Sequence, residues 1–226
     1  MTPPAGVVFD LDGTLVLTEG RNAVVWRSFF EGNGVGYDDE LAHHVMGRRA
    51  QDSLVELTHL FPDRPMDELV REVLAIDMAV PLSDVQPVAG AVRLVRRLVD
   101  AGMPLALVTS AGRAYARGLL REVGLLDAFA TSVTGEDVSR GKPDPEGYLA
   151  ACEGLGLAPA VVVGFEDSRA GVAAVKSAGM SCVAVATTQP RELLAAADIV
   201  IADFEDLEPV GWLREVRGTR HSLGGA

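Results

Sequence analysis

The spacing of apolar positions divides the chain into three parts. A short, fully apolar run at residues 7–9 ends in turn residues and is typical of a buried parallel strand. From about Glu19 to Met78 the apolar positions recur at helical spacing with few strand signals, which predicts a bundle of helices. From about Pro87 onward, short apolar runs alternate with amphipathic segments.

This alternation predicts an α/β fold. The first helix of the third part is expected over Val88–Ala101, with Gly102 at its end. The expected strands are Leu105–Val108, Ala130–Val133, Ala160–Val163, Cys182–Ala186 and Ile199–Ile201. Repeated β-α units of this length indicate a doubly wound, Rossmann-like parallel sheet.

The helical region is then an insertion between the first strand and the rest of the sheet. We expect an α/β core domain of residues 1–16 and 87–226 and an α-helical cap domain of residues 17–86. The crossing points near residues 15–18 and 82–87 are the expected hinges of a lid. The last stretch, Arg217–Ala226, contains Gly and Ser and is expected to fray.

Composition and charge narrow the class of protein. The 226 residues are 48% hydrophobic, enough for a sizeable core. No apolar run approaches the roughly 18 to 20 residues that span a bilayer. The net charge of -12 argues against nucleic acid or an anionic membrane as a partner. Cys152 and Cys182 have neither metal-ligand nor disulfide-framework spacing, so we expect reduced core thiols and a cytoplasmic protein.

Two carboxylates, Asp10 and Asp12, follow the first strand at i, i+2 spacing. Open α/β sheets place ligand sites at this end of their strands. Two acids this close resist joint ionisation unless a cation or a shared proton relieves them. The pair therefore indicates either a divalent metal or a nucleophile beside an acid/base group. The alternative is an ordinary turn built on Asp12-Gly13.

Two later segments carry polar groups suited to phosphate. Thr109 and Ser110 end an apolar strand just before a helix, where they can hold a phosphate oxygen or merely cap that helix. Lys142 precedes another helix, and the chain has only one other lysine, Lys176. A lysine in an arginine-rich chain indicates a compact cation for a phosphate or a carboxylate. The alternative is a solvated surface lysine.

Acids recur at the end of one more apolar strand, at Glu166 and Asp167. Hard oxygen ligands with room for water are what Mg²⁺ prefers. An acidic helix start, with Asp167 or Ser168 as the cap, is the competing explanation. Because parallel strands end at one edge of a sheet, acids, hydroxyls and lysine at successive strands are expected to converge on one site.

Four segments together resemble the four motifs of the haloacid dehalogenase superfamily. They are DLDGTL at 10–15, VTS at 108–110, GKPDPEGYL at 141–149 and GFEDSRAGVAAVKSAGM at 164–180. The resemblance covers roughly residues 6–210. The helical insertion after the first motif is similar to the cap of the branch that contains β-phosphoglucomutase and the small sugar-phosphate phosphatases.

The resemblance implies a role for each catalytic position. Asp10 is implied to be the nucleophile that becomes a transient aspartyl phosphate, and Asp12 the acid/base that protonates the leaving oxygen and then activates water. Thr109 is implied to bind the phosphoryl group, with assistance from the backbone near Asp12 and Ser110. Lys142 is implied to balance charge between Asp10 and the phosphate.

The resemblance also implies a Mg²⁺ cofactor. Its ligands are implied to be Asp10, Asp167 and the main-chain carbonyl of Asp12, with Glu166 supporting the site. A metal suits this chemistry, because a phosphate dianion and a carboxylate nucleophile repel each other.

Single positions separate the chemistries within the superfamily. Dehalogenases release a halide that needs no proton, so an acid at Asp12 would be superfluous. Phosphonoacetaldehyde hydrolases use a cap lysine, and no lysine precedes Lys142. β-Phosphoglucomutase carries a cap histidine and a cap arginine where this chain has Asn22 and Ala50, and Arg48 or Arg49 is the alternative for the arginine's phosphate-binding role. A non-catalytic member is disfavoured, because all of the motif residues are present.

The sequence therefore predicts a Mg²⁺-dependent phosphatase for a small phosphorylated metabolite, a sugar or polyol phosphate, with a β-phosphoglucomutase-like isomerase as the alternative. Expected cap contacts to the substrate are Glu19, Asn22, Arg48 and Arg49. A cap of this size encloses the site, which argues against phosphoprotein substrates. We expect a monomer or a weak dimer.

Overall fold

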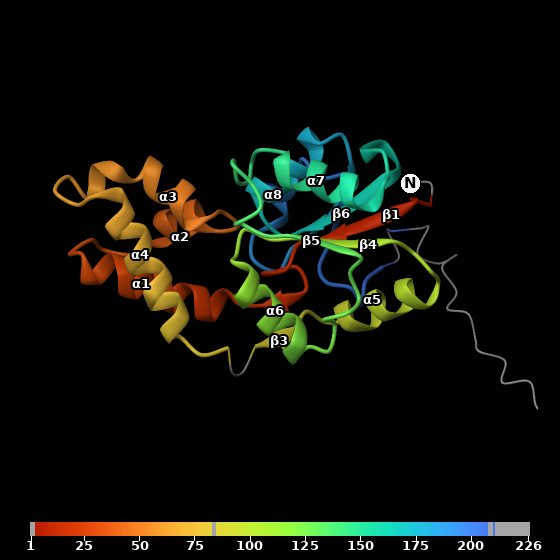
Figure 1. Cartoon of the computed structure of the whole chain (residues 1–226), viewed down its shortest axis with the longest axis horizontal. Coiled ribbons are helices and arrows are strands. Elements are labelled where there is room, and N and C mark those ends of the chain that lie inside the picture. The colour runs from red at the N-terminus through yellow and green to blue at the C-terminus, as the bar shows by residue number, and fades with distance from the viewer. Residues whose placement is uncertain (1–2, 83–84, 208–209, 211–226) are drawn as a thin grey trace, which may run out of the picture.

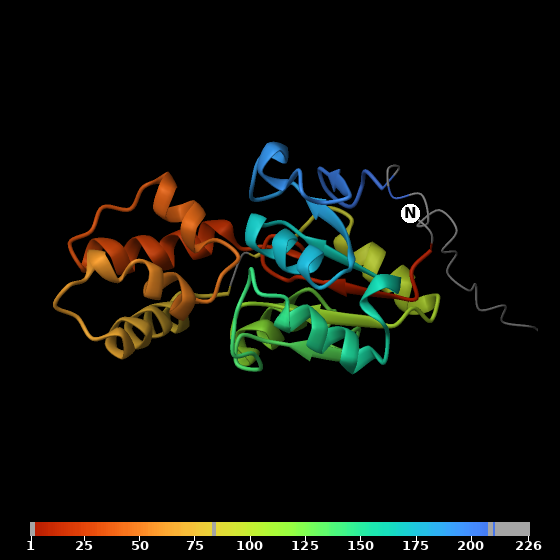
Figure 2. The ribbon, with the colours of Figure 1, turned by 90° about the horizontal axis from the view of Figure 1, so that it is seen from above.

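The computed structural model describes residues 3–82, 85–207 and 210. They form a sheet flanked by helices and, beside one end of that sheet, a separate group of helices (Figures 1 and 2). The strand β1 (Gly6–Phe9) runs from the marked N-terminus toward this helical group. Its carboxyl end, where Asp10 follows, therefore faces the inserted helices.

The central sheet is parallel throughout, with strand order β5-β4-β1-β6-β7-β8. Its other strands are β4 (Leu105–Val108), β5 (Thr131–Val133), β6 (Val162–Glu166), β7 (Ser181–Val185) and β8 (Ile199–Ile201). The chain extends the sheet through β4 and β5 on one side of β1, and then through β6, β7 and β8 on the other. The predicted doubly wound sheet is confirmed, and its switch point lies between β1 and β6, where such sheets bind ligands.

Helices cover both faces of the sheet. Two of them, α5 (Ala91–Asp100) and α6 (Arg113–Glu122), pack on the face that receives Val7 and Phe9. The opposite face, which receives Val8, is covered by α7 (Glu146–Leu155) and α8 (Arg169–Ser177). Figure 1 shows one pair of helices on each side of the sheet. Because β1 is buried on both faces, its sequence is apolar without alternation.

The inserted helices have a core of their own. They are α1 (Glu19–Gly32), α2 (Asp39–Val45), α3 (Ala50–Glu56), a short 3₁₀ helix (Thr58–Leu60) and α4 (Met66–Ala79). Phe29, Phe30, Leu54 and Leu69 are completely buried in this group. We call residues 19–79 the cap. No helix among the described residues is long and apolar enough to cross a membrane.

The two connections to the cap run antiparallel to each other. β2 (Val16–Leu17) pairs with β3 (Gln86–Pro87), and Val16 lies opposite Pro87. This pairing lies where the sequence places its domain boundaries, and the division at residues 16 and 87 stays a prediction. Part of the second expected hinge, residues 83–84, and the tail Arg217–Ala226 lie outside the described residues.

Two elements differ from their predicted ranges by more than one residue, and β5 and β7 differ by a single residue at their ends. The strand expected at Ala160–Val163 begins at Val162 and continues to Glu166, because Pro159, which lacks an N–H, starts a 3₁₀ turn through Val161. The helix expected from Val88 begins at Ala91. Val88 instead donates a backbone hydrogen bond to Leu15, and Gly90, at a φ of 77°, precedes the helix.

Candidate active site

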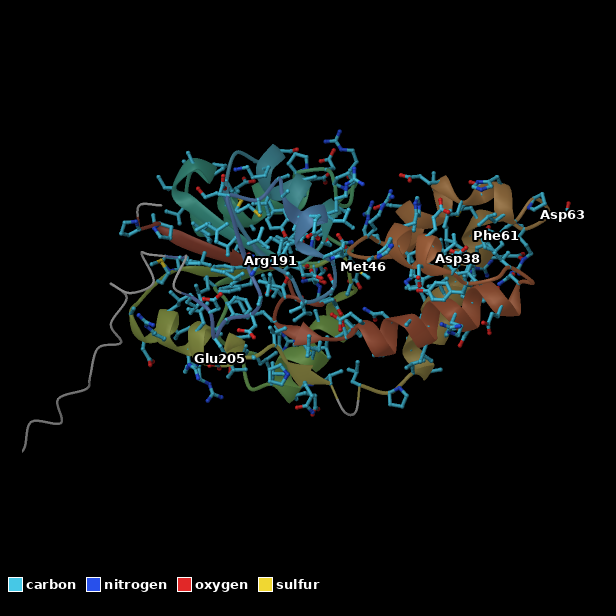
Figure 3. The ribbon with its side chains drawn as sticks, turned by 180° about the vertical axis from the view of Figure 1, so that it is seen from behind. Asp38, Met46, Phe61, Asp63, Arg191 and Glu205 are labelled. Atoms are coloured by element: carbon cyan, nitrogen blue, oxygen red, sulfur yellow. The ribbon has the colours of Figure 1, made fainter. Side chains whose placement is uncertain are left out.

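A cavity of about 270 Å³ lies between the carboxyl end of the sheet and the cap. The core lines it with Asp10, Asp12, Thr109, Ser110 and Asp167, and the cap lines it with Glu19, Asn22 and Arg48. Met46, which also lines it, lies at the junction of cap and core in Figure 3. The structure therefore brings all but three of the predicted site residues, Lys142, Glu166 and Arg49, onto the wall of one cavity.

Lys142 lies beneath this cavity, between two carboxylates. Its Nζ donates to Asp10 Oδ1 and to Glu166 Oε1, each at 2.5 Å, and its side chain is 5% exposed. Burial alone would lower the pKa of Lys142, but the charges of Asp10 and Glu166 raise it above its usual value. Lys142 is thus a buried, charged group, and the solvated alternative for it is excluded.

Asp10 remains partly unsatisfied. Burial raises its pKa to about 7, against the lowering effect of Lys142, and Glu166 and Asp12 add to the rise. Its second oxygen, Oδ2, is buried without a hydrogen-bond partner. An unpaired carboxylate oxygen is costly to bury, so this atom is suited to a cation or to a reaction partner.

Glu166 is fully engaged by the protein. Its Oε1 accepts from Lys142 and from the Tyr148 hydroxyl, and its Oε2 accepts from the backbone N–H groups of Asp167 and Ser168 and from the Ser168 hydroxyl. A Cβ at Gly171 would lie 1.8 Å from this carboxylate, so only glycine leaves room for it. Glu166 is therefore held rigidly beneath Asp10 and Asp167.

Asp167 is held by two threonines. Thr14 donates to its Oδ1 at 3.2 Å and Thr188 to its Oδ2 at 2.5 Å. Burial and the charges of Glu166 and Asp10 raise the pKa of Asp167 well above its usual value. One oxygen from each of these three carboxylates lies within 4.8 Å of the others. With one lysine beside them, the three acids leave uncompensated negative charge, which fits a divalent cation with oxygen ligands.

Asp12 is anchored through one oxygen. The hydroxyls of Thr18 and Tyr115 both donate to its Oδ1 at 2.8 Å, and Thr109 donates to its Oδ2 at 3.4 Å. Burial raises the pKa of Asp12. Burial and the charge of Asp12 also raise the pKa of Tyr115, so its phenol stays protonated. The carboxyl group lies between the linker at Thr18 and the helix α6.

The hydroxyls after β4 do not cap the following helix. The residue before α6 is Gly112, whereas Thr109 Oγ1 accepts from the backbone N–H of Ala111 at 3.0 Å. Ser110 Oγ donates to the carbonyl of Gly47, which belongs to the cap, at 2.9 Å. Thr109 thus lies beside Asp12, and Ser110 joins the core to the cap.

The two predicted cap arginines point to different places. Arg48 lines the cavity and pairs with Glu56. Arg49 pairs through two nitrogens with Asp52 and donates to backbone carbonyls of the core, at Val138 (2.7 Å) and Ser139 (2.9 Å). Arg49 therefore fastens the cap to the loop between β5 and α7 and does not line the main cavity.

Several residues that hold the acids were not predicted from the sequence. They are Thr14, Thr18, Tyr115, Tyr148 and Thr188. Thr14 lies within the DLDGTL segment, so it could have been predicted from the sequence. The two tyrosines lie in amphipathic helices, where an aromatic residue is typical of core packing. No local pattern distinguishes them from such core residues.

The comparison with known families agrees with this geometry. The family model described as "Hydrolase: haloacid dehalogenase-like hydrolase" matches residues 4–179. The chain belongs to this family. Its predicted membership of the haloacid dehalogenase superfamily is confirmed.

Individual relatives match this hydrolase over almost its whole length. It is 40% identical to "Validoxylamine A 7'-phosphate phosphatase" of Streptomyces hygroscopicus subsp. limoneus, over 88% of this chain and 94% of that protein. It is 32% identical to "Hexitol phosphatase A" of Escherichia coli (strain K12), over 89% and 92%. The crystal structure of β-phosphoglucomutase from Clostridium difficile superposes with a TM-score of 0.82 at 22% identity, covering 94% of this chain and 98% of that one. The last likeness shows that the fold, cap included, is shared.

Proposed function

We propose that this hydrolase is a Mg²⁺-dependent phosphatase for a small phosphorylated carbohydrate or polyol. One observation carries the proposal: Lys142 pairs with Asp10 Oδ1 at 2.5 Å and leaves the buried Oδ2 of Asp10 without a partner. This arrangement suits a carboxylate that attacks phosphorus beside a fixed positive charge. The printed names of the 40% and 32% identical relatives, both phosphatases, support the same reaction class.

The reaction proceeds in two displacements. An Asp10 oxygen forms a bond to phosphorus, the bond from phosphorus to the ester oxygen breaks, and Asp12 gives its proton to that leaving oxygen. The Asp12 carboxylate then takes a proton from water, whose oxygen attacks the aspartyl phosphate. The bond between Asp10 and phosphorus breaks, and inorganic phosphate leaves. Thr109 and the backbone near Ser110 hold phosphoryl oxygens, and Lys142 offsets charge throughout.

The acids beside Asp10 fit a magnesium ion. We assign its binding to Asp10, Asp167 and the main-chain carbonyl of Asp12. Glu166, whose oxygens already accept from the protein, supports the site by fixing Lys142 and the backbone of Asp167. When bound, the cation neutralises negative charge on the phosphate and on the nucleophile.

The cavity defines what the leaving group can be. Glu19, Asn22 and Arg48 provide polar contacts on the cap side, and Trp26 and Val45 add apolar wall. A volume of about 270 Å³ holds a small metabolite, and closure of the cap over it is expected to exclude bulk water from the aspartyl phosphate. We therefore propose a sugar-sized leaving group and not a phosphoprotein.

The isomerase alternative is less well supported. β-Phosphoglucomutase chemistry is expected to use a histidine and an arginine at positions that Asn22 and Ala50 occupy here, and both of these line the cavity. Neither Asn22 nor Ala50 carries a positive charge for a second phosphate, and the remaining candidate for that role is Arg48, which also lines the cavity.

The test is phosphate release from a panel of sugar and polyol phosphates, including glucose 6-phosphate, sorbitol 6-phosphate and validoxylamine A 7'-phosphate. We expect Mg²⁺-dependent release that falls by at least about 10³-fold in Asp10→Asn, because this change removes the nucleophile. Asp63→Asn, the same change at an exposed cap position (Figure 3), is the control and should retain parent activity. Conversion of glucose 1-phosphate to glucose 6-phosphate with little free phosphate would instead identify an isomerase.

A further inference from the structure

The acid/base candidate Asp12 is held by two hydroxyls that come from different parts of the molecule. Thr18 lies in the linker immediately before α1, and Tyr115 lies on α6 of the core. Both donate to the same oxygen, Oδ1, at 2.8 Å. Nothing in the four sequence motifs or in the reaction outlined above assigns a task to Tyr115.

A cap arginine covers the ring of this tyrosine. The Arg21 guanidinium carbon, from α1, lies 4.8 Å from the centroid of the Tyr115 ring. Arg21 is itself fixed, because Nη1 pairs with Asp77 of α4 at 2.5 Å and Nη2 donates to the carbonyl of Val80 at 3.0 Å. Its side chain is only 7% exposed, so the cation over the ring is largely desolvated, where such contacts are strongest.

These contacts form one continuous path from the cap to the acid/base. Asp77 and Val80 hold Arg21, Arg21 packs on Tyr115, and Tyr115 bonds Asp12. Both long helices of the cap, α1 and α4, contribute to it. The orientation of the Asp12 carboxyl group therefore depends on residues of the cap as well as of the core.

The bonding also decides which oxygen of Asp12 carries the proton. A carboxyl oxygen that already accepts from two hydroxyls has no lone pair left for a proton. Oδ2 has one long contact, 3.4 Å from Thr109 Oγ1, and lies on the side of the phosphoryl-binding threonine. The transferable proton is therefore placed on Oδ2, toward the leaving group.

We propose that Tyr115 is a positioning residue that fixes Asp12 with Oδ2 directed at the leaving oxygen, and that Arg21 makes this positioning depend on the docked cap. The inference rests on the proposed function, since it concerns proton delivery in the first displacement. The proposal predicts that loss of the Tyr115 hydroxyl lowers kcat/KM only for substrates whose leaving group needs a proton.

The experiment compares two substrates in Tyr115→Phe. One is the alkyl phosphate that the parent protein turns over fastest in the sugar and polyol panel, and the other is 4-nitrophenyl phosphate, whose leaving group departs as a stable anion. The quantity measured is kcat/KM, which reports the steps through leaving-group departure and not the later hydrolysis of the aspartyl phosphate. We expect kcat/KM to fall about 10- to 100-fold for the alkyl phosphate, a fraction of the 10²- to 10⁴-fold that a general acid contributes. For the nitrophenyl ester we expect a change of less than about 3-fold, because its departure does not draw on general-acid catalysis.

Two further variants separate positioning from a structural role. Arg21→Lys keeps the charge but loses the planar group over the ring, and we expect the same selective loss in a weaker form. Thr58→Val removes an exposed cap hydroxyl, which bonds to the Val55 carbonyl and does not line the cavity, and it should leave the ratio of the two kcat/KM values unchanged. Thermal melts of each variant check that it is folded.

Three results would contradict the proposed roles of Tyr115 and Arg21. Equal losses on both substrates, or no loss on either, would show that Tyr115 does not direct proton delivery. A selective loss in Tyr115→Phe with the parent ratio in Arg21→Lys would refute the part played by the cap. A parent protein that releases phosphate from neither substrate with Mg²⁺ would overturn the proposed function itself, and this inference with it.

Discussion

Lys142 shows how much depends on one side chain in this hydrolase. It lies between Asp10 and Glu166, 2.5 Å from each, and all three residues are buried. The lysine neutralises the negative charge of two carboxylates that are buried away from water. Its loss therefore affects stability as well as chemistry.

We expect Lys142→Met to lower the free energy of unfolding by about 3 to 5 kcal/mol at pH 7, because removing one partner of a buried ion pair leaves uncompensated charge. Urea unfolding measures this change. Lys176→Met is the matched control, since Lys176 pairs with Asp198 at a position where both side chains are over one third exposed, and it should cost less than about 1 kcal/mol. Equal costs for the two variants would contradict the view that Lys142 neutralises buried charge.

At the scale of elements, single polar side chains connect the ends of neighbouring strands and helices. Asp198 lies just before β8, and its carboxylate accepts from Lys176 of α8 and from the backbone N–H of Cys182 in β7, each at 2.7 Å. One surface carboxylate thus ties three neighbouring elements together. Burial would raise the pKa of Asp198, but these donors lower it below its usual value.

We expect Asp198→Asn to cost about 1 kcal/mol at neutral pH, the scale of a half-exposed charged hydrogen bond. Because the folded-state pKa is lowered, this contribution is present above the unfolded pKa of about 4 and is lost as pH falls through the folded value. The difference in stability between parent and variant should therefore shrink between pH 7 and about pH 3. Urea titrations at both pH values measure it, and a difference independent of pH would refute the assignment. Asp63→Asn controls for the loss of a surface charge.

At the scale of the whole molecule, the cap is fastened to the core by polar contacts. Arg49 donates to carbonyls of the core at Val138 and Ser139, and Ser110 of the core donates to Gly47 of the cap. These contacts fix the position of the cap on the core.

We expect Arg49→Ala to populate an open cap, because the variant loses its hydrogen bonds to the core while the core of the cap is untouched. Small-angle X-ray scattering should then report a larger radius of gyration, and kcat/KM should fall about 10-fold as closure becomes less favourable. Arg64→Ala is the control, since the side-chain contacts that the structure describes for Arg64, to Asn33, Glu68 and Glu72, all lie within the cap. An unchanged radius with lowered kcat/KM would favour direct substrate binding by Arg49.

The expected monomer or weak dimer and the cytoplasmic location stay predictions.

The sequence by itself determined the elements, their order and the place where the chemistry gathers. Apolar spacing is a local property, so it predicted the parallel strands and the inserted helices. Parallel strands end at one edge of the sheet, and Asp10, Thr109 and Asp167 therefore had to come together. Only the tertiary structure decided that Tyr115 bonds Asp12, across 103 positions of sequence, and that Arg49 turns to the core and not to the cavity. Such contacts depend on how the cap is oriented on the sheet, and no local pattern encodes that orientation.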